Sequence, residues 1–351
     1  MTTMSLTETA FQTRRAIKFG TIFIVALISI NIMWTVGYSA YRKIFPAPPP
    51  PPEVRFNKLP ALIFDPKLAI PALTYTLQTP TGELPKFPTQ VNVFFMPTPQ
   101  SSFLSLDDAN KIAKSLNFSN SGVSLSEVIY RYTHTEVPAT LDINIVNKTL
   151  SLSYNLAQDA SLLNLHPKSD EDALAATRSF LNRASLLTPD LDQGKQTFDY
   201  LRTAPEALQT VGSLSDANFI RVNLWRKEYD DLPIITPRVD RSNVWFLVSG
   251  SSSTYKQIIA GEYHYFAISE NQRSTYPIKT SKIAWDELQA GKGMIISTPS
   301  STNQVVIRRV YLGYYDSGKV QQFLEPVVVF DGDNGFRAII PAVTNEWYGA
   351  Q

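Results

Sequence analysis

The chain has 351 residues, with 32 basic and 31 acidic side chains, three histidines and no cysteine. A formal net charge of +1 gives no global reason to expect a nucleic-acid partner. The lack of cysteine excludes disulfides, thiolate zinc sites, iron–sulfur clusters and cysteine nucleophiles. Hydrophobic residues make up 44% of the chain and charged residues 18%, which suits a sizeable core and not a disordered chain.

An uncharged apolar segment lies near the N-terminus, at residues 19–41. As a helix rising 1.5 Å per residue it spans about 34 Å, enough to cross the hydrocarbon core of a bilayer. Aromatic rings gather toward its C-terminal end, where they favour the membrane interface: Trp34, Tyr38 and Tyr41. The segment therefore predicts a single transmembrane helix.

The basic residues around this segment predict its orientation. Three precede it, between residues 14 and 18, and two follow it, which favours a cytoplasmic N-terminus by a small margin. We expect an uncleaved signal anchor, with a cytoplasmic tail at residues 1–18 and residues 42–351 outside the cytoplasm, at a cell membrane. A signal peptide cleaved after Ala40 is the alternative.

A proline-rich linker follows at residues 42–52. Its five consecutive prolines, residues 48–52, favour a polyproline II helix without backbone donors, which acts as a stiff spacer. Residues 53–100 are also rich in proline and contain short runs of strand-forming residues. We expect this stretch to be irregular chain with a few strands, packed on the first globular module.

The remaining sequence repeats one pattern three times: a helix and then three or more strands. Each helix begins near a serine or threonine that can cap it, and apolar residues follow at helical spacing. Tight turns such as Asn147-Lys148 favour antiparallel hairpins between neighbouring strands. The predicted modules span residues 101–168, 169–270 and 271–351.

The predicted fold class is therefore α+β, with one N-terminal transmembrane helix followed by tandem modules in which helices cover antiparallel sheets. The second module is the longest and least regular, because residues 188–242 depart from the repeated pattern. The sequence leaves open whether the modules share one continuous sheet.

The segments SLDDANKIAKSLNF, SDEDALAATRSFLN and TSKIAWDELQAGKG, each followed by strands, resemble the PepSY-type module. The C-terminal segments VVIRRVYLGYYDS, FLEPVVVFDG and FRAIIPAV also resemble the end of membrane-anchored regulators of the Yyc type, in which cystatin-like modules follow a single helix. This resemblance implies a bacterial cell envelope and the restraint of a sensor kinase by contacts in the membrane and outside it. It brings no signature catalytic residues.

No catalytic, cofactor or metal site is predicted. His134, His166 and His264 lie far apart and lack the spacing of a zinc motif. The acidic turn at residues 331–335 fails the EF-hand pattern and is better explained as a hairpin turn. Serine is abundant, but no spacing selects a Ser/Lys dyad.

Aromatic residues form the one candidate interaction surface. Some flank an acidic cluster at residues 228–231, and others occupy two strand-like runs. Packing in the core is the competing interpretation, which the alternating strand positions favour. The candidates are Trp225, Tyr229, Tyr263, Tyr265, Tyr311, Tyr314 and Tyr315.

The leading hypothesis is a membrane-anchored extracytoplasmic protein that acts through protein–protein contacts and is not an enzyme. Its expected partners are the lipid bilayer and a membrane or envelope protein, such as a sensor kinase or an envelope assembly. The first alternative is a module that binds a cell-wall polymer or small ligand by stacking on Tyr and Trp. A less favoured alternative is a hydrolase with an unrecognised Ser/Asp site.

Overall fold

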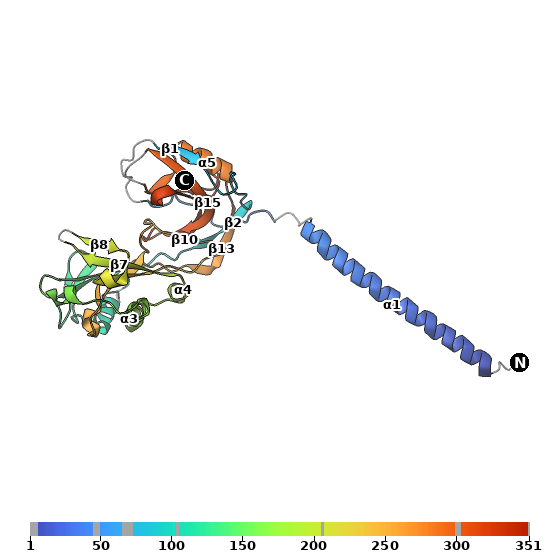
Figure 1. Cartoon of the computed structure of the whole chain (residues 1–351), viewed down its shortest axis with the longest axis horizontal. Coiled ribbons are helices and arrows are strands. Elements are labelled where there is room, and N and C mark those ends of the chain that lie inside the picture. The colour runs from blue at the N-terminus through green and yellow to red at the C-terminus, as the bar shows by residue number, and fades with distance from the viewer. Residues whose placement is uncertain are drawn as a thin grey trace. The chain divides into compact units, whose positions relative to one another are not determined.

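The computed structural model of the chain describes residues 6–44, 50–64, 73–100, 102, 105–204, 207–298 and 303–349. The chain divides into two compact units, Met1–Pro51 and Pro52–Gln351. The first unit holds one long helix, and the second holds two β-sheets with shorter helices packed on them (Figure 1). This arrangement confirms the predicted α+β class.

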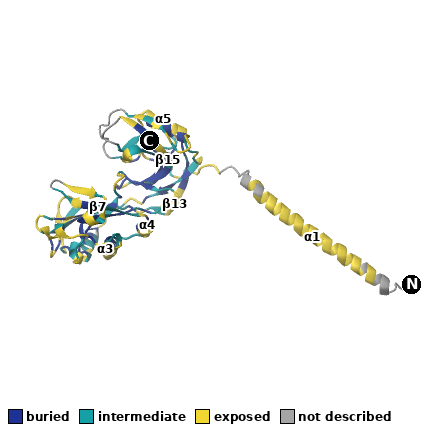
Figure 2. Ribbon diagram, in the orientation of Figure 1, coloured by how far each residue is buried: buried dark blue, intermediate teal, exposed yellow. Residues whose placement is uncertain are grey.

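Helix α1 (Leu6–Ile44) contains the predicted transmembrane segment. Its stretch Thr13–Ser39 is long and apolar enough to cross a membrane, and its described side chains are all exposed (Figure 2). The helix begins well before the apolar segment because residues 6–18 are mostly good helix formers. Of the predicted linker, residues 42–44 continue the helix and residues 45–49 lie outside the described residues.

The larger sheet has nine antiparallel strands in the order β3-β4-β5-β6-β12-β11-β9-β7-β8. Helices α2 (Ser105–Ser115) and α3 (Asp170–Arg183) pack on it. The short helix α4 (Pro189–Asp192) follows α3. The strands are β3 (Val123–Ser124), β4 (Ile129–Thr133), β5 (Ala139–Asn144), β6 (Leu150–Tyr154), β7 (Gln196–Thr203), β8 (Leu208–Val211), β9 (Phe219–Leu224), β11 (Val244–Ser249) and β12 (Ile258–Tyr263).

One row of paired residues shows how β5 and β6 bury one face of this sheet. Leu141 pairs with Leu152, and Gly261 lies between Leu152 and Phe246 in the register. Phe246 then packs against Phe180 of α3, with 5.2 Å between ring centroids. A side chain at Gly261 would collide with the Phe246 ring, since a Cβ there would lie 2.2 Å from a ring atom. Alternating apolar residues in β5 and β6 therefore supply the core, as their sequence predicts.

The second sheet has eight strands, with the path β1-β15-β16-β17-β14. Strand β2 pairs with β13 and β16, and β10 pairs with β15. Helix α5 (Ser281–Gln289) packs on β17. The strands are β1 (Thr74–Leu77), β2 (Gln90–Phe95), β10 (Ile234–Ile235), β13 (Ser269–Pro277), β14 (Met294–Ser297), β15 (Gln304–Tyr315), β16 (Phe323–Gly332) and β17 (Arg337–Pro341).

The structure corrects the predicted place of residues 53–100. Its described strands join the C-terminal sheet and not the sheet of the first module: β1 lies beside β15, and β2 lies beside β13 and β16. The β1–β15 pair is parallel and joins residues more than 200 positions apart, which local sequence patterns do not encode. The predicted first and second modules also share one sheet, because β6 pairs with β12.

Local signals at helix and strand ends agree with the structure. The Ser169 hydroxyl accepts a hydrogen bond from the Asp172 amide at 3.1 Å, and the Thr280 hydroxyl accepts one from Ile283 at 3.3 Å. Lys148 has φ +59° in the β5–β6 turn, and Gly291 has φ +71° just after α5. Capping residues and turn residues thus mark the element boundaries correctly.

Candidate functional site

Some of the predicted aromatic residues lie around a buried cluster of charged side chains, which is described in the next paragraphs, and the others lie along strand β15. Tyr229, Tyr263, Tyr314 and Tyr315 are at most 5% exposed, so they do not form part of a surface. They belong to three clusters of buried apolar residues, which is the packing interpretation. Three others are half-buried: Trp225, Tyr265 and Tyr311. The ring of Phe94 links Tyr229 and Tyr314, at 5.5 and 5.4 Å between centroids.

Arg226 is the centre of the buried cluster. Its Nε donates to Asp316 Oδ2 at 2.8 Å, and its Nη1 donates to Asp190 Oδ2 at 2.9 Å. Its Nη2 donates to the Phe266 carbonyl oxygen, and its guanidinium lies 4.1 Å from the centroid of the Tyr265 ring. The three charged side chains are 2–8% exposed.

Both carboxylates of the cluster accept further hydrogen bonds. Asp190 Oδ1 accepts hydrogen bonds from the hydroxyls of Thr188 and Tyr265 and from the Leu191 amide. Asp316 Oδ1 accepts one from the Gly318 amide at 3.0 Å. Burial disfavours the charge of Arg226, but Asp316 and Asp190 hold its pKa above the ordinary value. A buried ion cluster needs such complete pairing to be stable.

The cluster joins the two sheets. Arg226 follows β9 of the nine-stranded sheet, whereas Asp316 follows β15 of the other sheet. The cavity beside it is about 10 Å³, room for at most one water molecule. Burial also raises the pKa values of Tyr229, Tyr263 and Tyr265, so these phenols stay protonated. The arrangement holds elements together and leaves no space for a substrate.

Sequence reasoning found the aromatic neighbours of this cluster and missed its charged members. Arg226 lies two positions after Leu224, the last residue of β9, a strand with four apolar residues out of six. A charge at that place was the available signal, because buried charges need partners. The partners, Asp190 and Asp316, lie 36 and 90 residues away in the chain, so spacing does not identify them.

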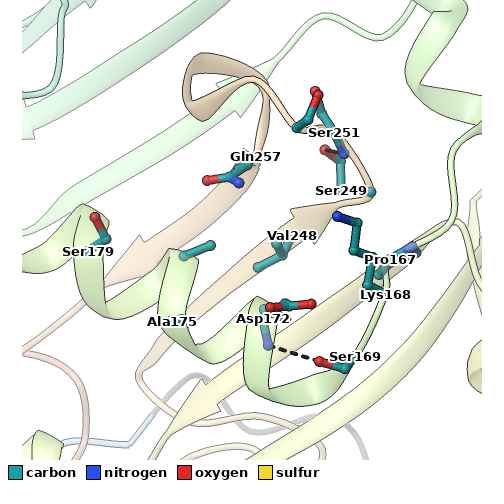
Figure 3. Close-up of a pocket in the computed structure, with 14 residues that line it drawn as sticks. Pro167, Lys168, Ser169, Asp172, Ala175, Ser179, Val248, Ser249, Ser251 and Gln257 are labelled. Carbon is teal, nitrogen blue, oxygen red and sulfur yellow. Dashed lines mark hydrogen bonds between the residues drawn. The ribbon is translucent and has the colours of Figure 1, made fainter.

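A groove lies between α3 and the hairpin of β11 and β12. Its volume is about 400 Å³, and Figure 3 shows Ser179, Ala175 and Asp172 along one wall and Val248, Ser249 and Ser251 along the other. Lys168 and Gln257 also line it. Gly250 is required at the hairpin end, since a Cβ there would lie 2.3 Å from the His166 carbonyl oxygen.

The groove offers hydrogen-bonding groups. The Ser249 hydroxyl donates to the Lys256 carbonyl oxygen, and Ser169 caps α3. Lys168 is exposed, whereas a lysine that acts as a base requires desolvation. Among the residues that the structure describes, no hydrogen bond joins Lys168 to a serine hydroxyl.

Each of the three histidines has a ring nitrogen within hydrogen-bonding distance of a backbone atom. His134 Nδ1 accepts from the Glu136 amide at 3.1 Å, and burial lowers its pKa. The Nδ1 atoms of His166 and His264 lie 2.7 and 3.2 Å from the carbonyl oxygens of Ala217 and Gly318. Within the described ranges, no group of three or more His, Asp or Glu side chains is arranged to hold a metal ion.

Comparison with known proteins gives distant structural similarity only. No family model and no curated protein matches the chain. An uncharacterized protein from Eubacterium rectale ATCC 33656 is 13% identical with a TM-score of 0.41, over 75% of this chain and 86% of its own. The Bacillus megaterium YpeB C-terminal domain is 12% identical with a TM-score of 0.31, over 71% of this chain and 95% of its own.

Both TM-scores lie below 0.5, so these similarities carry no argument about activity or partners. The PepSY-type resemblance therefore stays a prediction. The class that sequence and structure define together is an α+β protein with one N-terminal helix able to span a membrane.

Proposed function

We propose that this chain is a single-pass membrane protein whose sheet-rich unit lies outside the cytoplasm and binds another protein. The observation that carries the proposal is the stretch Thr13–Ser39 of α1, which is apolar and whose side chains are all exposed. The small excess of basic residues before it supports a cytoplasmic N-terminus. A linker that contains five consecutive prolines separates it from the sheets.

Strand β8 is the contact surface that we propose for the partner. It ends the nine-stranded sheet and pairs only with β7 among the described strands. Its sequence, Leu-Gln-Thr-Val, carries no charge and no proline, and Leu208 is 40% exposed. Natural edge strands usually carry such protective residues, and an edge without them can accept a further strand from another chain. The opposite edge, β3, has only two residues.

A topology measurement tests the membrane part of the proposal. We expect a reporter fused after Gln351 to be active only outside the cytoplasm. Activity only in the cytoplasm would overturn the proposed orientation. Extraction with alkaline carbonate tests the anchoring itself, since a chain that spans the bilayer stays in the membrane fraction.

In-cell crosslinking of the full chain, followed by mass spectrometry, tests the contact surface. The variant Thr210→Lys places a charge on the β8 edge and should abolish capture of the partner. The matched control is Ser151→Lys, an exposed position on the central strand β6, which should keep the partner. Equal capture by both variants would show that β8 is not the contact surface.

We propose binding rather than catalysis, and the groove beside α3 gives a second candidate function. Its volume of about 400 Å³ and its hydroxyl-rich lining suit a polar polymer or small ligand. Cell-wall fragments should then retain the protein, and Ser251→Tyr, which fills the groove, should release it. Retention that Ser251→Tyr leaves unchanged would exclude the groove as the binding site.

A further inference from the structure

We propose that two copies of this chain pair in the membrane through the face of α1 that carries Asn31. The inference rests on the membrane-spanning helix of the proposed function and adds a partner for that helix: a second, parallel copy. It is carried by Asn31, the one side-chain amide in the apolar segment of α1.

Asn31 is the one side-chain amide between residues 19 and 41, where the other short polar side chains are Ser and Thr hydroxyls. The Thr21 hydroxyl donates to the Ile17 carbonyl oxygen at 2.8 Å, and the Thr35 hydroxyl donates to the Asn31 carbonyl oxygen at 3.0 Å. These hydroxyls are satisfied within the helix. The side-chain amide of Asn31 has no hydrogen-bond partner in the part of the chain that the structure describes, and its residue is exposed. In hydrocarbon such an amide favours a partner on another helix.

The position of Asn31 makes a second copy the fitting partner. The uncharged run is bounded by Lys18 and Arg42, and Asn31 lies next to its midpoint. Copies of one sequence insert with the same orientation, so their Asn31 residues lie at the same depth. An amide is both donor and acceptor, and two amides related by a two-fold axis satisfy each other. A single buried asparagine has this pairing role in parallel coiled coils.

The surrounding face suits close helix packing. Ile24 and Tyr38 lie seven positions before and after Asn31, and Thr35 lies four after it, so all share its side of the helix. Gly20 lies on the same side, and its position has no side chain to keep helices apart. This face carries no charge between residues 19 and 41, so a partner with an opposite charge is not required.

The lack of native cysteine allows a clean disulfide scan of the full chain in membrane vesicles. Ile24→Cys and Thr35→Cys lie on the Asn31 face, whereas Ile22→Cys and Met33→Cys lie on the opposite side of the helix. After copper–phenanthroline oxidation, we expect crosslinked dimers from the first pair and few from the second. Equal crosslinking from both sides, or crosslinks only to a different protein, would overturn the proposed pairing.

The role of the amide is tested in the Ile24→Cys background. Asn31→Leu keeps a similar volume without the amide, and we expect it to reduce the crosslinked dimer by about tenfold. Asn31→Gln should restore much of the dimer, and Ser29→Leu on the opposite side should leave it unchanged. A dimer that persists in Asn31→Leu refutes the inference. Release of the chain by carbonate instead refutes the anchoring, so the two failures are distinguishable.

Discussion

Glu325 gives the sharpest test of the electrostatics of this fold. It lies on β16, paired with Tyr315 of β15, and is 3% exposed. Its Oε2 atom has no hydrogen-bond partner among the described residues. Burial raises the pKa of its carboxyl group well above the ordinary value of 4.5. The folded protein therefore keeps a proton on Glu325 at pH values where the unfolded chain has lost it.

The sign of the effect follows from proton linkage. Below pH 4.5 both states are protonated, and Glu325 causes no dependence on pH. Above pH 4.5 the unfolded state loses its proton first, so this residue lowers the free energy of unfolding by about 1.4 kcal/mol per pH unit. The loss continues until the pH exceeds the folded-state pKa. Glu325→Gln keeps the shape and removes the titration, so its advantage over the native residue should grow with that slope.

Urea unfolding of residues 52–351 at pH 5.5 and 6.5, followed by circular dichroism, measures this slope. The difference in the free energy of unfolding between Glu325→Gln and the native sequence should be larger at pH 6.5 than at pH 5.5, by up to about 1.4 kcal/mol. The control is Glu127→Gln at an exposed position, which should show no such increase. A difference that does not change with pH would mean that Glu325 ionises in the folded state, and the reasoning would fail.

Three further changes test the packing of the second unit by urea unfolding. Arg226→Met leaves two buried carboxylates without their cation and should lower the free energy of unfolding by about 3 kcal/mol or more. Adding Asp316→Asn should recover part of this loss. Gly194→Ala would place a Cβ 1.8 Å from the Trp225 carbonyl oxygen and should cost about 2 kcal/mol or more, whereas Gly212→Ala, with open space around it, should change stability by less than about 0.5 kcal/mol. Thr280→Ala removes the cap of α5 and should lower the free energy of unfolding by about 1 kcal/mol. A change near zero would show that the cap does not stabilise the fold.

Local physics was enough to predict several elements of this fold. The helix start at Ser169 and the hairpin at Asn147-Lys148 depend on residues within a few positions of each other. Alternation along β5 also predicted its buried face, since period-two patterning is set by the strand itself. These features need no information from distant parts of the chain.

Pairing between distant strands was not predictable in this way. Residues 53–100 are predicted to pack on the first module, yet β1 pairs with β15 and β2 with β13. Each strand there offers the same backbone hydrogen bonds to any neighbour, and the choice depends on the packing of the complete core. Parallel pairs such as β1–β15 have no hairpin turn that would reveal them.

The buried cluster around Arg226 shows the same limit for side chains. The aromatic residues near it were found because aromatic runs are visible in sequence, but their burial depends on both sheets. Arg226 follows the end of strand β9 in one sheet, and Asp316 follows the end of strand β15 in the other. Neither charge has this partner until both sheets are built, and an unpaired buried charge is costly. The cluster therefore stabilises the association of the two sheets rather than either sheet alone. For this reason no single segment of the sequence predicts it.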